Sequence, residues 1–304
     1  MDKKSLHWGI DLGGTKIEGA VIQLGNGFKV LARERIPTES YLGYSHILKR
    51  IANIIKILEN KTGDKPTKIG FGTPGTIDSE TGLLKNSNTV CMIGKPVKQD
   101  LEKSLALQVH ISNDANCFTL AETKLGVVKN LKKTPKTVFG VIMGTGVGGG
   151  LVINGHIING LHGIGGEWGH NYLDNSGGTC YCGKTGCVET IISGIALEKF
   201  YFKNSGKRLN LKKIYERSEQ GSDKIAVQTI KRLHHFFGKA ISTVCNILDP
   251  EVIILGGGVG NITSLYTEGK KELAKYIFND GKVKTSILRP KLGDSAGVFG
   301  AALL

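Results

Sequence analysis

Short apolar segments separated by glycines open the chain and predict β-strands. Residues 6–10 and 17–24 are apolar runs on either side of Gly13 and Gly14, and another strand is expected from Phe28. Six apolar side chains then recur at the spacing of one helix face, which predicts an amphipathic helix that ends near Gly63. The six are Ile47, Leu48, Ile51, Ile54, Ile55 and Leu58.

Strands and helices continue to alternate along the rest of the chain. The pattern predicts strands at 68–72, 109–112, 138–143, 151–153 and 252–255, and helices at 114–125, 189–203, 223–248 and 295–304. Asn113 or Asp114 is the expected N-cap of the helix at 114. The last helix is short and apolar and is expected to pack on the first half. Such alternation is typical of α/β proteins with central sheets.

Two stretches about 130 residues apart share one pattern, a strand hairpin with a glycine turn. They are DLGGTKIEGAVI and GTGVGGGLVING. The repeat predicts a duplicated fold in which two α/β domains surround a central cleft. We expect a small domain of residues 1–115 with about 290–304, and a larger domain of residues 116–289 that carries a cysteine-rich loop.

The composition is that of a globular chain with an excess of glycine and positive charge. Of 304 residues 43 are glycine, and the formal net charge is +14. No apolar run approaches the roughly 20 residues of a membrane span, and the N-terminus lacks a signal-peptide pattern, so a cytoplasmic protein with reduced thiols or a metal is expected. The charge raises nucleic acids and anionic small molecules as partners, but the lysine-rich run at 129–136 has no interleaved aromatic residues and is interpreted as solvated surface.

Three glycine-rich turns follow apolar strands and favour phosphate binding. They lie at 11–16, 144–150 and 256–258. Without a Cβ, glycine lets backbone N–H groups approach an anion, and Thr15 and Lys16 add a hydroxyl and a charge. None has P-loop spacing, and the first is followed by a strand rather than by the helix of a dinucleotide fingerprint. A single such turn is more often structural, but three in one chain favour a nucleotide.

Six motifs in order resemble the sugar kinases of the ROK family, which belongs to the actin and hexokinase superfamily. The motifs are DLGGTK, NDANC, GTGVGGG, GGEWGH, CYCGKTGCVE and LGGGV, and the likeness extends over residues 9–302. The stretches LLKNSN, GEWGHN and CYCGKTGCVETIISG are most similar to bacterial fructokinases of the family. The resemblance therefore implies fructose as the substrate and fructose 6-phosphate as the product, with N-acetylglucosamine, glucose and mannose as alternatives.

The resemblance implies an ATP site that the glycine turns build. Asp11 would orient Mg²⁺, usually through water, because this ion keeps most of its hydration shell. The implied ATP-binding residues are Asp11, Gly13, Gly14, Thr15, Lys16, Gly144, Thr145, Gly146, Gly148, Gly149, Gly150, Gly256, Gly257 and Gly258.

The resemblance also implies the catalytic base and the sugar contacts. Asp114 matches the base, and a positioned carboxylate can remove the proton of a sugar hydroxyl, although an aspartate here could merely cap a helix. The implied sugar contacts are Gly75, Asn88, Asn113, Asp114, Glu167, His170 and Glu189. The alternative for Glu167 and Glu189 is solvent-exposed charge, and Trp168 fits a core residue.

One histidine and three cysteines have the spacing H-x9-C-x-C-x4-C and predict a zinc site. His170, Cys180, Cys182 and Cys187 supply a complete tetrahedral set, which is typical of structural zinc. A disulfide or unpaired thiols are the alternatives, but Cys180 and Cys182 are too close for an easy disulfide. The other cysteines, Cys91, Cys117 and Cys245, are interpreted as isolated thiols.

Sugar-responsive transcriptional repressors of the same family are the competing functional class. They carry a DNA-binding domain before the sugar fold, whereas here the kinase pattern starts at Asp11. We therefore expect a kinase without specific nucleic-acid binding or membrane attachment. A homodimer is common in the family and is expected here.

Overall fold

The glycine turn at 13–14 joins two antiparallel strands, as the apolar pattern predicts. In the computed structural model, which describes residues 5–25 and 27–304, β1 (Leu6–Leu12) pairs with β2 (Lys16–Gly25), and β2 pairs with β3 (Gly27–Pro37). Two parallel strands, β4 (Lys68–Thr73) and β7 (Gln108–Asn113), extend the sheet beyond β1. The strand order is β3-β2-β1-β4-β7.

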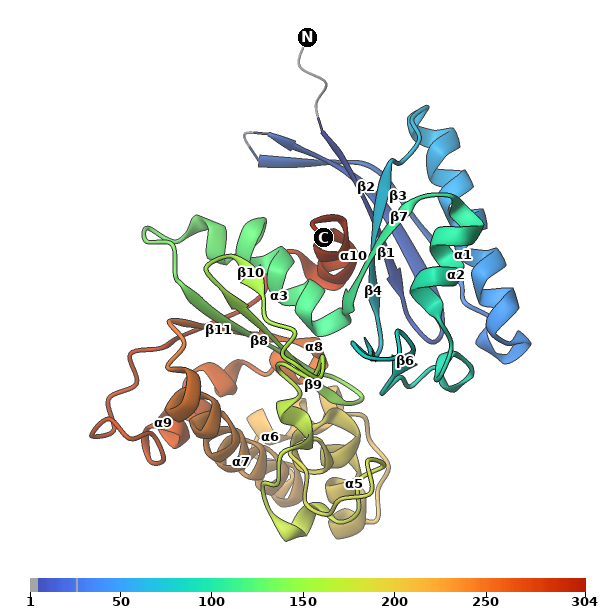
Figure 1. Ribbon diagram of the computed structural model, residues 1–304. Coiled ribbons are helices and arrows are strands. Elements are labelled where there is room, and N and C mark those ends of the chain that lie inside the picture. Colours follow the sequence, from blue (N-terminus) through green and yellow to red (C-terminus); the bar gives the residue numbers. More distant parts are fainter. Residues whose placement is uncertain (1–4, 26) are drawn as a thin grey trace. The chain divides into compact units, whose positions relative to one another are not determined.

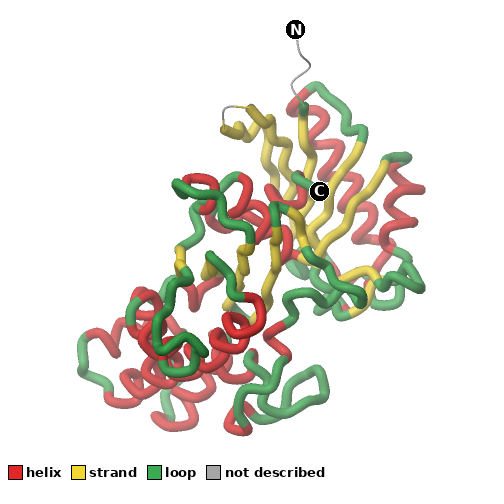
Figure 2. The backbone as a smooth tube through the Cα atoms, turned by 60° about the vertical axis from the view of Figure 1, so that its left-hand side comes forward, coloured by secondary structure: helices red, strands yellow, loops and turns green. Residues whose placement is uncertain are grey.

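Helices cover both faces of this first sheet (Figures 1 and 2). The apolar side of α1 (Tyr44–Thr62) packs with α2 (Val97–Leu105) on the strands, and the shared core includes Ile10, Ile51 and Phe71. On the other face, α10 (Ala296–Ala302) packs on β1, β4 and α3 (Asp114–Lys124). The expected return of the C-terminal helix to the first half is therefore confirmed.

The second sheet repeats the first. Its strands are β8 (Thr137–Met143), β9 (Val147–Ile153), β10 (His156–Ile157), β11 (Val252–Gly256) and β12 (Ser286–Leu288). Their order, β10-β9-β8-β11-β12, matches that of the first sheet, with an antiparallel meander followed by two parallel strands. The predicted α/β class and its internal duplication are confirmed.

The chain divides into two compact units. The first consists of the residues through Thr134, Gly150–Gly165 and Lys291–Leu304, and the second of Pro135–Gly149 and Gly166–Pro290. The first unit also holds the short strands β5 (Thr76–Ile77) and β6 (Leu84–Lys85). The second contains α4 (Glu189–Ile192), α5 (Gly194–Ser205), α6 (Leu211–Glu219), α7 (Lys224–Leu248), α8 (Gly257–Gly260) and α9 (Glu268–Ala274).

Several local predictions are confirmed and one is wrong. Gly63 ends α1 in the left-handed conformation, and Asn113 caps α3 by accepting a hydrogen bond from the Ala115 N–H at 2.9 Å. The single helix predicted at 189–203 is instead two helices. Ser193 is extended between them, and its hydroxyl accepts the Ala196 N–H to cap α5, which ends the first helix.

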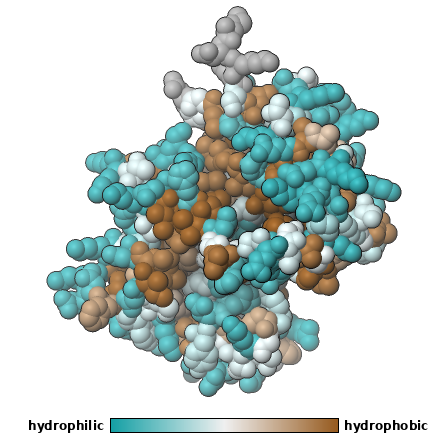
Figure 3. Space-filling model, in the orientation of Figure 1, coloured by the Kyte–Doolittle hydropathy of each residue, from teal (hydrophilic) through white to brown (hydrophobic). Residues whose placement is uncertain are grey.

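Charged side chains cover the outer side of the first unit. Figure 3 shows hydrophilic residues over α1 and α2, where Lys49, Lys56 and Lys61 of α1 are exposed. Within residues 5–25 and 27–304, no helix combines the length and the apolar composition that crossing a bilayer requires.

Candidate functional site

The first glycine turn is held in shape by its own backbone and by two hydroxyls. The Gly13 N–H donates to the Lys16 carbonyl at 3.0 Å, and Thr38 Oγ1 donates to the Gly13 carbonyl at 2.7 Å. Ser40 Oγ donates to the Gly14 carbonyl at 3.0 Å. The carbonyls of Gly13 and Gly14 thus accept hydrogen bonds from within the protein. Thr15 and Lys16 are exposed, so the turn offers a hydroxyl and a positive charge to an anion.

Two carboxylates, Asp11 and Asp114, lie at the same edge of the first sheet. Asp11 is near the end of β1, and Asp114 directly follows β7 at the first turn of α3. Strands β1 and β7 both run parallel to β4, which lies between them. The carboxyl ends of parallel strands meet at one edge, where α/β proteins bind ligands.

The pKa values of both carboxyl groups are raised. Burial raises the pKa of Asp11 to about 7, and the charges of Asp114 and Glu18 add to the effect. Asp114 is solvent-accessible, yet protein atoms crowd it, and this desolvation raises its pKa. Burial and the two aspartates also raise the pKa of the Cys117 thiol, which therefore stays protonated at neutral pH.

The structure brings the other predicted sugar contacts of the first unit to this edge. The Asn113 amide donates to the Gly75 carbonyl at 3.4 Å, while its oxygen caps α3. The capping role therefore belongs to Asn113, although Asp114 Oδ1 also accepts the Ala115 N–H at 2.8 Å. Asn88 lies beside Gly14, so it adjoins the first glycine turn.

Hydrogen bonds connect the second glycine turn to two residues further along the chain. Glu189 Oε2 accepts the Val147 N–H at 2.9 Å, and Trp168 Nε1 donates to the Gly148 carbonyl at 3.1 Å. A Cβ on Gly146 would lie 2.5 Å from Glu189 Oε2, so a side chain at this position would have to displace the carboxylate. Trp168 is buried, as expected of a core residue, and its indole N–H also anchors the turn.

The predicted metal ligands converge in the second unit. One ligand atom from each of His170, Cys180, Cys182 and Cys187 lies within 4.8 Å of all the others. The Sγ atoms of Cys182 and Cys187 are 3.6 Å apart, and Cys180 Sγ lies 3.7 Å from His170 Nδ1. A tetrahedral zinc with bonds of about 2.3 Å to sulfur and 2.0 Å to nitrogen has edges of about 3.5–3.8 Å, so the four residues fit this ion. All six cysteines are free thiols in the described part of the chain.

His170 presents its two ring nitrogens to different partners. Nδ1 faces the cysteines, whereas Nε2 lies 3.0 Å from the hydroxyl of Tyr181, on the loop between two of the ligands. The two rings meet edge to face, with centroids 5.2 Å apart. A short 3-10 helix over Trp168–His170 begins after Glu167, whose carbonyl accepts the His170 N–H at 3.3 Å. Sequence reasoning did not identify Tyr181 as a partner of His170.

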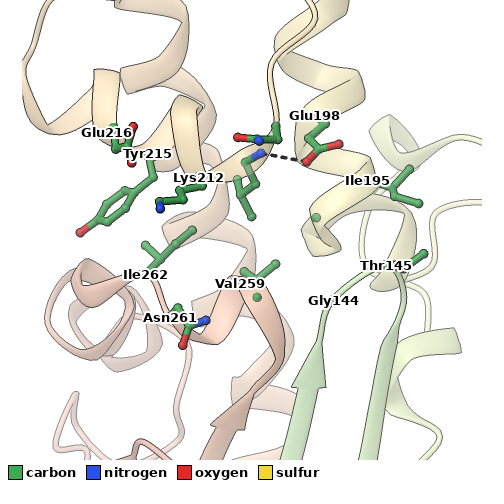
Figure 4. Close-up of a pocket in the computed structure, with 14 residues that line it drawn as sticks. Gly144, Thr145, Ile195, Glu198, Lys212, Tyr215, Glu216, Val259, Asn261 and Ile262 are labelled. Carbon is green, nitrogen blue, oxygen red and sulfur yellow. Dashed lines mark hydrogen bonds between the residues drawn. The ribbon is translucent and has the colours of Figure 1, made fainter. Parts of the chain in front are cut away.

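A cavity of about 730 Å³ joins the second and third glycine turns within the second unit (Figure 4). Gly144, Thr145 and Gly258 line it, and Gly257 shapes the turn beside it. Gly257 has φ +78°, and a Cβ there would lie 2.3 Å from the Met143 carbonyl, so this position requires glycine.

None of the other eleven lining residues was predicted. They come from α5, α6 and the segment after β11, and comprise Gly194, Ile195, Glu198, Asn210, Leu211, Lys212, Tyr215, Glu216, Val259, Asn261 and Ile262. Figure 4 shows Lys212 and Tyr215 on one side of the cavity. The Leu211 N–H donates to Glu198 Oε1 at 2.8 Å. Asn210, which caps α6 through the Lys213 N–H, was a usable signal for this helix.

Comparison with known proteins agrees with this geometry. A family model described as the ROK family matches residues 7–304. The chain belongs to the ROK family. The crystal structure of a ROK hexokinase from Thermus thermophilus has a TM-score of 0.84 at 30% identity, with 98% of this chain and 97% of that one covered. The predicted actin and hexokinase-like architecture is thus confirmed.

Two other ROK-family comparisons bear on the ligands. An N-acetyl-D-glucosamine kinase from Aliivibrio salmonicida is 35% identical over 309 residues, which covers 98% of this chain and 99% of the relative. A glucokinase from Streptomyces griseus, crystallised with glucose and AMPPNP, is 25% identical, with a TM-score of 0.79 and 98% of each chain covered. Further relatives at 33–36% identity are also named N-acetyl-D-glucosamine kinases. The narrower expectation of a fructokinase finds no support among these relatives.

Proposed function

We propose that this chain is an ATP-dependent sugar kinase that phosphorylates a hydroxyl of N-acetyl-D-glucosamine. The observation that carries the kinase assignment is Asp114, a carboxylate of raised pKa beside Asp11 at the ligand-binding edge of the first sheet. The relatives named above favour the substrate, because they match nearly the whole chain. Fructose, which the motifs alone favoured, becomes an alternative together with glucose and mannose.

In the proposed reaction, Asp114 accepts the proton of the sugar hydroxyl. The hydroxyl oxygen forms a bond to the γ-phosphorus of ATP, the bond from that phosphorus to the bridging oxygen breaks, and ADP leaves. Mg²⁺, when bound, neutralises phosphate charge. Asp11 would orient it through water, since a carboxylate that burial and a neighbouring charge destabilise gains from a cation. The turn at 13–16 would hold phosphate oxygens through Thr15 and Lys16.

The cavity of the second unit is proposed to receive the adenosine. Gly144, Thr145 and Gly258 would line the phosphate end. The carboxylates of Glu198 and Glu216 line the cavity and can accept a hydrogen bond from the exocyclic amine of adenine. The ring of Tyr215 offers an aromatic face for the base. The glucokinase crystallised with AMPPNP supports ATP as the phosphate donor.

The four-residue cluster is proposed to hold a structural zinc ion. Three thiolates and His170 Nδ1 would hold the ion, and this complete tetrahedral set would leave no open position for chemistry. Binding at Nδ1 leaves the proton of the neutral imidazole on Nε2, and His170 can then donate to a sugar hydroxyl. Glu167 and Glu189 flank the same loop and would accept hydrogen bonds from the sugar.

Coupled ADP release with a panel of hexoses tests the proposal. We expect N-acetyl-D-glucosamine to give the highest kcat/KM, with fructose at least tenfold lower, which corresponds to about 1.4 kcal/mol. A panel led by fructose would restore the expectation from the motifs. No ADP release with any hexose would contradict the kinase assignment. The +14 charge is proposed to support only weak, salt-sensitive binding to DNA.

A further inference from the structure

The hydroxyl of Tyr181 lies where the proposed sugar contact of His170 has to form. It is 3.0 Å from Nε2, the ring nitrogen that faces away from the cysteines. We propose that Tyr181 competes with the sugar for His170 and thereby sets the affinity of the enzyme for its sugar. This inference rests on the proposed function, because it assumes that Nε2 binds a sugar hydroxyl.

The competition follows from the chemistry of the imidazole. A metal at Nδ1 fixes the neutral tautomer with one hydrogen on Nε2, and that hydrogen points along one direction in the ring plane. In that tautomer Tyr181 Oη, which lies 3.0 Å from Nε2, would accept this hydrogen. A sugar hydroxyl therefore has to displace the phenol before it can accept the same bond.

The surroundings of Tyr181 allow such a displacement. Its side chain is 81% exposed, so rotation away from His170 exposes little additional apolar surface. Tyr181 lies between Cys180 and Cys182. If both cysteines bind the metal, they fix the backbone on either side of Tyr181 and keep the phenol close to His170. What the sugar must overcome is the single hydrogen bond and the edge-to-face contact of the two rings.

The same position brings the phenol close to the proposed sugar carboxylates. Glu189 and Glu167 both act electrostatically on the Tyr181 hydroxyl, so it lies within the field of the groups that would bind the sugar. A ligand that bonds to a carboxylate and to Nε2 together gains two interactions for the one it displaces. The competition therefore weakens the binding of every sugar that uses Nε2, and a sugar that reaches both groups still binds.

Tyr181→Phe tests the proposal, because it removes the hydroxyl and keeps the ring. Tyr172→Phe is the matched control, since Tyr172 is an exposed tyrosine of the same loop whose backbone bridges to Cys187. Titration calorimetry with N-acetyl-D-glucosamine, glucose and fructose measures Kd, and elemental analysis measures zinc per chain. We expect Tyr181→Phe to lower the Kd of the best sugar about fivefold, the worth of one net hydrogen bond. Zinc content and kcat should not change, and Tyr172→Phe should match the wild type.

Other outcomes overturn the inference in distinguishable ways. A Kd that rises in Tyr181→Phe would show that the hydroxyl binds the sugar instead of competing with it. An unchanged Kd would show that the bond to His170 has no influence on affinity. If the wild-type protein binds none of the sugars, the proposed function fails and the competition fails with it. A sugar-bound crystal structure gives an independent check, because the Tyr181 hydroxyl should lie beyond hydrogen-bonding distance of Nε2.

Discussion

Glu189 Oε2 accepts a hydrogen bond from the Val147 N–H at 2.9 Å. The family resemblance assigns Glu189 to the sugar and the second glycine turn to ATP. This hydrogen bond therefore joins a proposed sugar contact to the proposed phosphate-binding turn. Glu189 begins α4 two residues after Cys187, so the same residue also adjoins the metal cluster. In the second unit, the Glu189 side chain thus links the proposed sugar contact to the glycine turn, and its backbone follows the metal cluster in the chain.

Replacing Glu189 should separate its two roles. In Glu189→Gln the amide oxygen can still accept from Val147, so we expect a sugar KM about tenfold higher and an ATP KM within about twofold of wild type. In Glu189→Ala the turn also loses its acceptor, and the ATP KM should rise several-fold as well. Initial rates with each substrate varied in turn measure both constants. Equal ATP KM values in the two variants would contradict the link to the turn.

Asp114→Asn should abolish turnover and leave the fold intact. The amide keeps the shape of the side chain but cannot take up the proton, so kcat should fall at least about 100-fold. Circular dichroism and the Kd for the sugar should stay close to wild type. Asp64→Asn, at an exposed aspartate of the same unit, is the control. A variant at position 114 that retains more than about a tenth of wild-type kcat would show that another group is the base.

Asp11 should make the free protein less stable as the pH rises. The folded state holds the proton up to a pKa of about 7, whereas the unfolded chain releases it near the ordinary value of 3.8. Between these values the folded state binds more protons, so its stability falls with rising pH and stays low above pH 7. Asp11→Asn removes this penalty.

Urea unfolding at pH 5 and pH 8 measures the effect. Relative to wild type, Asp11→Asn should gain roughly 2–3 kcal/mol more at pH 8 than at pH 5. Asp64→Asn again serves as the control and should show no such pH-dependent gain. Equal gains for Asp11→Asn at both pH values would mean that the carboxylate does not titrate in this range.

Cys182→Ser should remove the metal and weaken sugar binding together. A serine hydroxyl is a poor replacement for a zinc thiolate, so zinc should fall from one per chain to well below one. Loss of the ion frees His170 from its tautomer, and the sugar KM should rise about tenfold or more while the ATP KM changes little. Cys91→Ser, outside the cluster, is the control. Freshly purified wild-type protein without zinc, or a metal-free variant with an unchanged sugar KM, would refute this account.

The sequence predicted local features well because neighbouring residues determine them. The hairpin around Gly13 and Gly14, the end of α1 at Gly63 and the Asn113 cap all depend on contacts within a few positions. The four metal ligands could also be predicted from the sequence, since their spacing within 18 residues matches a known donor set.

Features that depend on distant segments were missed. The cavity combines a glycine turn near residue 144 with α6 and Ile262, which lie far apart in the chain. The bond between Tyr181 and His170 depends on the path of the metal loop, which the spacing of its ligands does not fix. The break between α4 and α5 at Ser193 was not predicted, because a serine inside an apolar pattern does not by itself end a helix.

A competition assay tests the central claim most directly. The protein is incubated with ATP, Mg²⁺ and an equimolar mixture of N-acetyl-D-glucosamine, glucose, mannose and fructose. Because three of the sugar phosphates have the same mass, chromatography separates the products before mass spectrometry, and their initial proportions report the relative kcat/KM values. We predict that N-acetyl-D-glucosamine phosphate forms first and in excess, and that Asp114→Asn yields none of the products. An excess of fructose phosphate would contradict the proposed substrate, and no sugar phosphate at all would contradict the assignment of the chain as a sugar kinase.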